Sequence, residues 1–576
     1  MHWADLIVEE LVRCGVEMFV MAPGSRSTPL VAAVAAQPRA RAVMHYDERG
    51  TAFFALGYGR ATRQPAAWIT TSGTALANGY PAIVEAATDG VPMLLLTADR
   101  PPELRATGAN QTIDQPGLFG AYVRWAFDLP ASTPAIDPSV ILTTVDQAVH
   151  RARRTPQGPV HLNCMFREPL APEPEPAPEG AAGPLRWRTS AAPYTRYDAA
   201  PRRPDAGAVV HLAERLRAAR RGLVVAGRLA TVEEGRAALQ LAERLGWPLL
   251  PDVGSQLRLG HGAAESVIPH YDLVLGSEAF ADAHAPEAVV QVGARPTSKR
   301  LGQWLARHRP DPYVLVHDDP RRIDPHHHVT DRIEAGVAAF CAVLAEAVAT
   351  PGDASWRAAW READQRATAA LTGALGDAEA ISEPWVARAV ARAIPSGHGL
   401  VLASSMPVRD VDMFAPADGA AVPVAANRGA SGIDGLVATA AGFCEGRGAP
   451  ATLLTGDLAL LHDLNSLALL RERPVTVVAI NNDGGGIFHF LPIARHEALF
   501  EPYFGTPHGL GFAHAAEMFG LPYARPATPA AFTAAYEAAR QRDGASLIEV
   551  RTERAANAAL HRRLLATAAA AVDRAG

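Results

Sequence analysis

Short apolar runs alternate with amphipathic stretches along most of this chain. The apolar runs have the length of buried strands and end in small or polar residues, whereas the stretches between them space their apolar residues like one face of a helix. In the N-terminal third these runs are MFVMAP from residue 18, AAWITTSG from residue 66 and VPMLLLTADRPP from residue 91. Buried strands separated by helices predict a parallel α/β sheet.

The same alternation returns in two later segments. Its apolar runs begin at residues 222, 288 and 313 in the middle of the chain, and at residues 399, 451, 474 and 546 nearer its end. Residues 352–395 have a mostly helical pattern, and the Pro- and Glu-rich residues 169–185 indicate a semi-rigid linker. We therefore predict three doubly wound parallel-sheet α/β domains, spanning residues 1–180, 190–350 and 351–576, the last with a leading helical connector.

Composition narrows the class of protein. The 576 residues include 54 basic and 60 acidic side chains, so the net charge of −6 argues against a nucleic-acid partner. No apolar run approaches the roughly 20 residues of a membrane span, and the acidic N-terminal stretch predicts an amphipathic helix, not a signal peptide. The four cysteines, which are scattered without a CxxC pair, predict buried thiols in a reducing cytoplasm. Lys299 is the only lysine among the basic residues.

Polar residues stand at the ends of two strand-like runs near the C-terminus. Asp457 follows ATLLTG, and Asn482 ends PVTVVAINN and begins the glycine-rich loop NDGGGIF. A right-handed crossover between parallel strands brings both ends to the same edge of the sheet, and the helix after Asp457 directs free N–H groups toward an anion. Carboxylate, amide and carbonyl oxygens suit Mg²⁺. Each pair alone is also typical of an Asx turn that closes a strand.

Taken together, the two pairs resemble the Gly-Asp and Asn-Asn motif of thiamine-diphosphate enzymes. This resemblance implies that Asp457, Asn482 and the Gly484 carbonyl bind Mg²⁺, or Mn²⁺ in its place. It also implies a carboxyl group that binds the aminopyrimidine of the cofactor, for which Glu48 in HYDERGTAFFALG is the candidate, although an acid there can simply cap a helix. In such enzymes this glutamate and the metal site come from different subunits, so a homodimer or homotetramer is implied.

Several loops after strand-like runs carry arginines and amides. These loops are APGSRSTPL, TADRPPEL, GANQTIDQ, TSKRLGQW, SSMPVRD and ANRGASGIDG. Together with DERG and NNDGGGIF, they closely resemble the 2-succinyl-5-enolpyruvyl-6-hydroxy-3-cyclohexene-1-carboxylate synthase family of menaquinone (vitamin K2) biosynthesis. The likeness runs nearly from end to end of the chain.

This family resemblance implies a transferase reaction. It decarboxylates 2-oxoglutarate on thiamine diphosphate and adds the resulting succinyl-semialdehyde carbanion to isochorismate in a 1,4-addition. Three carboxylates then need paired cations, and arginine suits planar carboxylates. The implied catalytic residues are Glu48, Ser405, Arg409 and Arg428, of which the two arginines would bind the keto acid. The residues implied for isochorismate are Ser25, Arg26, Asn110, Gln111, Lys299 and Arg300, with Arg100 nearby and Ile487, Phe488 and Leu491 as an apolar wall. The further cofactor contacts implied are Ser72, Gly73, Ser405, Met406, Ile433, Leu458, Ala459 and Ile487.

Some positions depart from the wider superfamily, and two other functions stay open. Leu458 and Ala459 replace a common Gly and Ser after Gly-Asp, and Ala403-Ser404 replaces a frequent Gly-Asn. One alternative is another thiamine-diphosphate 2-oxo-acid decarboxylase or carboligase, which the cluster of cations disfavours. The other is a non-catalytic nucleotide-binding regulator, weakly supported because GLVVAGRLA lacks a full GxGxxG. The run His326-His327-His328 indicates a polar loop more than a metal site.

Overall fold

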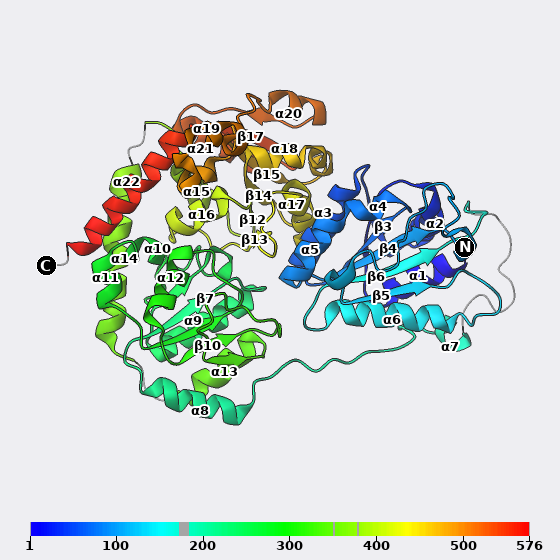
Figure 1. The fold of residues 1–576 in the computed structure, drawn as a ribbon, viewed down its shortest axis with the longest axis horizontal. Coiled ribbons are helices and arrows are strands. Elements are labelled where there is room, and N and C mark those ends of the chain that lie inside the picture. The colour runs from blue at the N-terminus through cyan, green and yellow to red at the C-terminus, as the bar shows by residue number, and fades with distance from the viewer. Residues whose placement is uncertain (1, 172–183, 349–351, 377–378, 575–576) are drawn as a thin grey trace. The chain divides into compact units, whose positions relative to one another are not determined.

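A computed structural model describes residues 2–171, 184–348, 352–376 and 379–574 (Figure 1). Most of the predicted linker at residues 169–185 lies outside these ranges. The chain divides into two compact units, which we describe one at a time. The first consists of residues 1–200, 427–449 and 459–475, and the second of residues 201–426, 450–458 and 476–576.

The first unit is built on a parallel sheet with the strand order β2-β1-β3-β4-β6-β5. Apolar side chains that alternate along β1, β3 and β4, such as Phe19, Ile69 and Leu96, pack against α1, α2 and α6 on one face. Helix α3 covers the other face at β1 and β3, and α5 packs beside it. Because both faces are covered, the sequences of the central strands are nearly continuous apolar runs. Its strands are β1 (Met18–Met21), β2 (Arg41–Met44), β3 (Ala66–Thr70), β4 (Met93–Asp99), β5 (Trp125–Leu129) and β6 (Pro159–Met165). Its helices are α1 (His2–Arg13), η1 (Ser25–Ser27), α2 (Thr28–Ala36), α3 (Glu48–Thr62), α4 (Thr74–Asn78), α5 (Tyr80–Asp89), η2 (Pro102–Leu104), η3 (Gly120–Tyr122), α6 (Ser139–Arg153), α7 (Leu185–Arg188), α17 (Leu436–Arg447) and η5 (Leu464–Leu470).

The second unit contains two further parallel sheets. The order of one is β11-β10-β9-β7-β8, and that of the other is β13-β12-β14-β15-β17-β16. In the first of these, Val224, Val290 and Val314 face α8, α9 and α13, whereas Leu223, Val225 and Val289 face the side of α10, α12, α14 and α22. Its strands are β7 (Gly222–Ala226), β8 (Leu249–Pro251), β9 (Ala288–Val292), β10 (Tyr313–Val316) and β11 (Asp331–Ile333). Its helices are α8 (Ala206–Arg217), α9 (Val232–Leu245), η4 (Val253–Ser255), α10 (Tyr271–Val274), α11 (Glu278–Ala283), α12 (Lys299–His308) and α13 (Val337–Ala347), followed by the connector helix α14 (Ala354–Leu375).

The last sheet positions the predicted metal loop. Its residues Leu402, Leu454 and Ile480 pack with α15, α16 and α21 in one apolar cluster. Its strands are β12 (Gly399–Leu402), β13 (Val424–Ala426), β14 (Ala451–Gly456), β15 (Val475–Asn481), β16 (Tyr523–Ala524) and β17 (Ser546–Arg551). Its helices are α15 (Glu383–Ala393), α16 (Met406–Phe414), α18 (Asp457–His462), η6 (Gly486–Phe490), η7 (Pro492–Arg495), α19 (Glu497–Phe500), the π-helical turn η8 (Glu501–Gly505), α20 (Ala513–Phe519), α21 (Pro529–Arg540) and α22 (Arg554–Asp573).

The predicted fold class is confirmed, with two local corrections. All three sheets place their first strand between the second and third, which creates a switch point where the crossovers diverge. The helix expected after Asp457 is shorter than the apolar pattern of residues 460–470 suggests: α18 ends at His462 and a 3₁₀ segment, η5, follows. Asp463 leaves the helical conformation and accepts hydrogen bonds from Ser466 Oγ at 2.6 Å and Ala438 N at 3.0 Å.

Cys14 is only half-buried, whereas the other three cysteines are buried as expected. The domain boundaries stay predictions.

Within the described ranges, no helix is both long enough and apolar enough to cross a membrane.

Candidate active site

The predicted metal loop lies at the carboxyl edge of the last sheet. Strands β14 and β15 are neighbours there, and Asp457 opens α18 directly after β14. Gly484 N donates to Asp457 Oδ2 at 2.9 Å, and Leu458 N donates to Oδ1 at 2.7 Å. Asp457 is buried, so its carboxylate is held by backbone donors away from bulk water. The two strand ends therefore meet, as the crossover argument required.

Asn482 offers an oxygen with no hydrogen-bond partner in the described ranges. Its Nδ2 donates to Glu383 Oε1 at 2.9 Å, whereas its buried Oδ1 has no hydrogen-bond partner among the described residues. Buried polar atoms are normally paired, so an orphaned buried oxygen needs an explanation. A hard divalent cation supplies one, because such ions take carboxylate, amide and carbonyl oxygens. Asp457, Asn482 and Gly484 thus fit a divalent metal ion.

A second loop closes over the glycines. Gly485 N donates to Gly505 O at 2.8 Å, and Gly484 has a φ of +133°. A Cβ at position 484 would lie 1.9 Å from Gly505 O, so only glycine fits this approach. From the same loop, His508 places Nε2 3.2 Å from Asp457 Oδ2. Because Leu510 N donates to His508 Nδ1 at 3.0 Å, Nε2 carries the hydrogen and donates to Asp457.

Buried ionisable groups lie behind Asn482. Burial, followed by the nearby Asp410 charge, raises the pKa of Glu383 to about 7. Asp410 Oδ1 lies 2.8 Å from His561 Nε2. Burial opposes the charged imidazole, but the Asp410 carboxylate raises the pKa of His561 above its ordinary value. Sequence reasoning missed Glu383, His508 and His561, because nothing in the local pattern separates them from capping or core residues.

The loop after β12 holds three of the predicted residues. Ser405 precedes α16 with a φ of +74°, a strained conformation for a residue other than glycine and one that clusters at functional sites. Arg409 lies one turn along α16 and its Nη1 contacts the Ser405 carbonyl oxygen. Met406 is buried.

In the first unit, predicted residues follow four adjacent strands. Ser25 and Arg26 follow β1, Glu48 follows β2, Ser72 and Gly73 follow β3, and Arg100 follows β4. The carboxyl ends of β2, β1, β3 and β4 thus carry every predicted residue from the first 100 positions, at the edge where ligands bind in such sheets.

Ser72, Arg100 and Gln111 form one polar network. Arg100 Nη1 contacts Ser72 Oγ and donates to Gln111 O at 2.9 Å, while Gln111 Nε2 donates to Ser72 O at 2.8 Å. Arg26 Nη1 donates to Phe166 O at 2.9 Å. Burial, together with the charge of Arg26, lowers the pKa of Arg100. Arg26 Nη2 pairs with Glu168 Oε1 at 3.3 Å, and the repulsion between the two buried guanidinium groups favours a further anion. Ser25 and Asn110 are exposed beside them.

Glu48 is the first residue of α3, but it is not the cap. The side chain of Asp47 accepts from Arg49 N at 3.0 Å and performs that role. The half-buried Glu48 carboxylate accepts from Asn78 Nδ2 at 3.3 Å, and its other oxygen, which accepts no side-chain hydrogen bond within the described part of the chain, can accept from a further partner. The helix N-terminus also favours a negative charge at this position.

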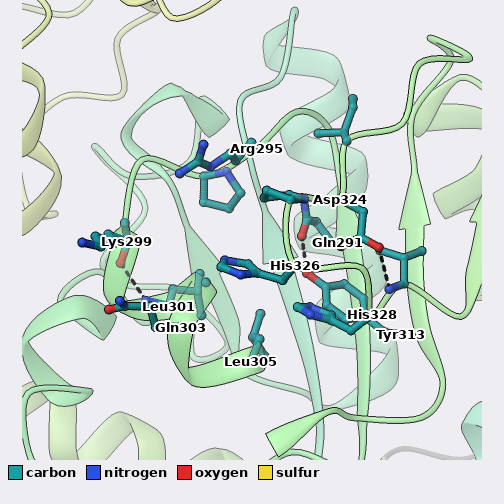
Figure 2. Close-up of a pocket in the computed structure, with 16 residues that line it drawn as sticks. Gln291, Arg295, Lys299, Leu301, Gln303, Leu305, Tyr313, Asp324, His326 and His328 are labelled. Atoms are coloured by element: carbon teal, nitrogen blue, oxygen red, sulfur yellow. Dashed lines mark hydrogen bonds between the residues drawn. The ribbon is translucent and has the colours of Figure 1, made fainter. Parts of the chain in front are cut away.

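Lys299 and Arg300 begin α12, after β9 of the middle sheet. Ser298 caps this helix by accepting from Leu301 N at 3.0 Å. Lys299 is exposed and lines a cavity of about 190 Å³ together with Arg295, His326 and His328 (Figure 2). Arg300 donates to Asp272 O at 2.6 Å and also contacts its carboxylate. The histidine run is a loop, as expected.

The remaining predicted residues are divided between the units. Arg428, Ile433 and Ala459 belong to the first, where Ala459 is buried, Arg428 is half-buried and Ile433 is exposed. Ile487 and Phe488 lie half-buried in η6 of the second unit, and Leu491 follows them on the surface.

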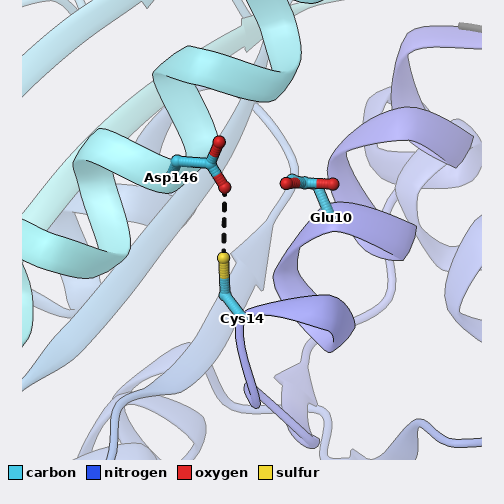
Figure 3. Close-up of side chains that lie close together, drawn as sticks. All are labelled: Glu10, Cys14 and Asp146. Carbon is cyan, nitrogen blue, oxygen red and sulfur yellow. Dashed lines mark hydrogen bonds between the residues drawn. The ribbon is translucent and has the colours of Figure 1, made fainter. Parts of the chain in front are cut away.

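A separate cluster joins Glu10, Cys14 and Asp146 (Figure 3). Cys14 Sγ donates to Asp146 Oδ1 at 3.3 Å, and Thr195 N donates to Asp146 Oδ2 at 2.7 Å. Trp187 Nε1 and Tyr194 N donate to the two oxygens of Glu10. Burial, with the neighbouring Asp146, raises the pKa of Glu10 to about 8. All four carboxyl oxygens accept protein hydrogen bonds, so this cluster holds the segment of residues 187–195 against α1 and α6.

Comparisons with known proteins show which family the chain belongs to. Three thiamine pyrophosphate enzyme models match: the N-terminal TPP binding domain at residues 1–118, the middle domain at 183–402 and the C-terminal TPP binding domain at 424–550. The fold also resembles benzoylformate decarboxylase from Polynucleobacter necessarius, with a TM-score of 0.70 at 17% identity, covering 96% of this chain and 98% of that one.

Two curated relatives are similar over nearly the whole chain. The 2-succinyl-5-enolpyruvyl-6-hydroxy-3-cyclohexene-1-carboxylate synthase of Rubrobacter xylanophilus is 60% identical over 567 residues, 98% of each chain. The enzyme of the same name from Salinibacter ruber is 53% identical, covering 99% of this chain and 97% of its own. The resemblance inferred from the motifs is confirmed: this chain belongs to the 2-succinyl-5-enolpyruvyl-6-hydroxy-3-cyclohexene-1-carboxylate synthase family of thiamine pyrophosphate enzymes.

Proposed function

We propose that this chain is a transferase that joins 2-oxoglutarate and isochorismate in menaquinone biosynthesis. It releases CO₂ from 2-oxoglutarate, forms a carbon–carbon bond between the remaining four-carbon fragment and isochorismate by 1,4-addition, and takes up one proton. The product is 2-succinyl-5-enolpyruvyl-6-hydroxy-3-cyclohexene-1-carboxylate, the compound after which both relatives are named.

The observation that carries the proposal is the pair of strand ends in the last sheet. Asp457 Oδ2 and Gly484 N are joined at 2.9 Å, and Asn482, two residues before Gly484, has a buried Oδ1 that lacks a partner among the described residues. Asp457, Asn482 and Gly484 would hold Mg²⁺, with Mn²⁺ as a substitute, and through it the diphosphate of the cofactor. When bound, thiamine diphosphate supplies the electron sink for decarboxylation of a 2-oxo acid.

The chain contributes orientation, charge and one proton. Glu48 would share a proton with the far ring nitrogen of the aminopyrimidine, using the oxygen that Asn78 leaves open. Ser72, Gly73, Met406, Ile433, Leu458, Ala459 and Ile487 would line the cofactor. Arg409 and Arg428 would bind the keto acid, with Ser405 close to the reacting carbon.

Isochorismate binding is assigned to cations and amides, with an apolar wall. Its two carboxylates would meet Ser25, Arg26, Arg100, Asn110, Gln111, Lys299 and Arg300, and its ring would lie against Ile487, Phe488 and Leu491. The lowered pKa of Arg100 supports this, because an anion between Arg26 and Arg100 relieves the repulsion between the two guanidinium groups. A charge-assisted hydrogen bond contributes about 1.5–3 kcal/mol, so each lost arginine weakens binding severely.

Coupled turnover tests the proposal. The purified chain is incubated with thiamine diphosphate, Mg²⁺, 2-oxoglutarate and isochorismate, and CO₂ release and isochorismate loss are measured together. We expect one CO₂ for each isochorismate consumed, and no isochorismate loss without 2-oxoglutarate. Equal or better use of pyruvate would instead favour another decarboxylase or carboligase. Calorimetry that detects no binding of thiamine diphosphate with Mg²⁺ would favour the non-catalytic regulator.

We also propose a homodimer or homotetramer in the cytoplasm. The metal-binding residues lie in one unit and Glu48 in the other, and related enzymes combine these groups from different subunits. All four cysteines are free thiols, which suits a reducing compartment. Light scattering during size-exclusion chromatography tests the assembly: an active monomer would contradict it.

A further inference from the structure

Asn481 ends β15 and Asn482 follows it, and each donates its amide group to a different buried glutamate. Asn481 Nδ2 donates to Glu549 Oε1 at 2.8 Å and to Leu510 O at 3.0 Å, while its Oδ1 accepts from Asp483 N at 3.3 Å. Both ends of Asn481 are therefore engaged. Asn482 differs, because its Nδ2 meets Glu383 at 2.9 Å but its buried Oδ1 has no partner in the described part of the chain.

The Glu383 side chain is held in one position by its surroundings. It is the first residue of α15, is almost completely buried, and follows the cap residue Ser382. The oxygen that meets Asn482 also accepts from Thr552 Oγ1 at 3.0 Å. Two donors on one buried oxygen, at the start of a helix packed into the apolar cluster of the last sheet, leave this acceptor little freedom.

A fixed acceptor determines which way a carboxamide points. The two ends of an asparagine side chain have nearly the same shape, so the hydrogen-bond network decides which end faces which neighbour. Here the oxygen of Glu383 takes the NH₂ end, and the oxygen end is left on the other side.

We propose that Glu383 is a positioning residue of the metal site, which holds the Asn482 carboxamide with its oxygen presented to the ion that Asp457 and Gly484 share. This inference rests on the proposed function, since it needs that ion. Partners that orient metal ligands in this way commonly change metal affinity by about 10–100-fold when they are replaced.

The variant Glu383→Gln separates orientation from packing. Glutamine keeps the size of the side chain and can still accept from Thr552, but its own amide group can also donate to Asn482 Oδ1 and turn that carboxamide around. The matched control is Glu549→Gln, the same change against Asn481, a residue with no role in the proposed site. Both variants are first compared with the parent chain by thermal unfolding, so that a folding defect is recognised.

The readout is Mn²⁺ affinity, measured by the loss of the electron paramagnetic resonance signal of free Mn²⁺ at a fixed thiamine diphosphate concentration. We expect Glu383→Gln to weaken Mn²⁺ binding by about 10–100-fold and Glu549→Gln to change it by less than about threefold. A Glu383→Gln affinity within threefold of the parent chain would overturn the proposal, and so would an equal loss in both variants. Failure of the parent chain itself to bind Mn²⁺ with the cofactor would refute the proposed function instead.

A swapped pair tests the same idea if Glu383→Gln folds poorly. Asn482→Asp alone sets two carboxyl groups against each other and should bind Mn²⁺ weakly. The double variant combines Glu383→Gln with Asn482→Asp, so that the introduced amide can donate to the introduced carboxylate. This exchange restores one donor facing one acceptor and leaves an oxygen for the ion. We expect the double variant to bind Mn²⁺ at least tenfold more tightly than Asn482→Asp, and an equal or weaker affinity would contradict the positioning role.

Discussion

Helices α3 and α17 of the first unit touch backbone to backbone, which permits a sharp stability test. Gly57 on α3 and Gly442 on α17 face the partner helix at the contact. A Cβ added at Gly442 would lie 2.0 Å from Phe54 O and 2.9 Å from Tyr58 N. These are backbone atoms of α3, so they cannot move aside as the end of a flexible side chain can.

Gly442→Ala therefore combines two effects of opposite sign. Alanine favours a helix interior over glycine by about 1 kcal/mol, whereas overpacking a tight core typically costs about 1–3 kcal/mol and occasionally more. Ordinary contact begins near 3.4 Å, so α17 would have to move away by about 1.4 Å (3.4 − 2.0) along its contact with α3. We expect packing to dominate, because the displaced atoms belong to a buried backbone, and the net loss to be about 2 kcal/mol.

Differential scanning calorimetry measures the change. For a unit of this size, a loss of about 2 kcal/mol lowers Tm by about 4–8 °C. The control is Gly373→Ala, in the exposed part of α14, where an added Cβ meets nothing within 4 Å. That variant should gain up to about 1 kcal/mol from helix propensity alone. If Gly442→Ala proved as stable as the parent chain, the close approach of the two helices would be wrong.

Four further predictions concern chemistry and pH. Glu48→Gln should keep cofactor binding but lower kcat by about 100-fold or more, as for a lost proton-transfer group, and unchanged turnover would refute its role. Asp457→Ala should weaken calorimetric binding of thiamine diphosphate with Mg²⁺ by more than about tenfold, whereas an unaltered Kd would remove it from the metal site. Lys299→Ala should raise the isochorismate KM by about tenfold or more and the 2-oxoglutarate KM less; the reverse order would exchange their binding sites. The pKa of Glu10, raised by burial and Asp146 to about 8, means that the folded chain holds a proton that the unfolded chain releases near pH 4.5. Stability should therefore fall as pH rises from about 5 to 8, and Glu10→Gln should flatten that fall; an identical pH profile in the variant would exclude Glu10 as its source.

The sequence pattern predicted those parts of the molecule that depend on local rules. Buried strands of four to seven residues are visible as apolar runs, and the polar residues after them must gather at the carboxyl edge of a parallel sheet. This is why the pattern places Asp457 at the same sheet edge as Asn482, whereas Arg26 and Arg100 are assigned to one ligand only through the family resemblance. Lys299 also stands out in the sequence because it is the only lysine among many arginines.

The residues that escaped prediction act through tertiary contacts. In the sequence, Glu383 is an ordinary acid at the start of a helix. Its role depends on a hydrogen bond from Asn482, a residue far along the chain. His508 lies in an irregular loop whose course over Gly484 has no periodic signal. The break at Asp463 depends on a hydrogen bond to Ala438, which lies 25 residues earlier in the chain (463 − 438).

The most direct measurement of the central claim is an anomalous diffraction map from crystals grown with thiamine diphosphate and Mn²⁺. The account predicts one Mn²⁺ peak within about 2.0–2.3 Å of an Asp457 carboxylate oxygen, Asn482 Oδ1 and Gly484 O, with the diphosphate as a further ligand. A cofactor bound with no peak between these three residues, or with the ion held elsewhere, would contradict it.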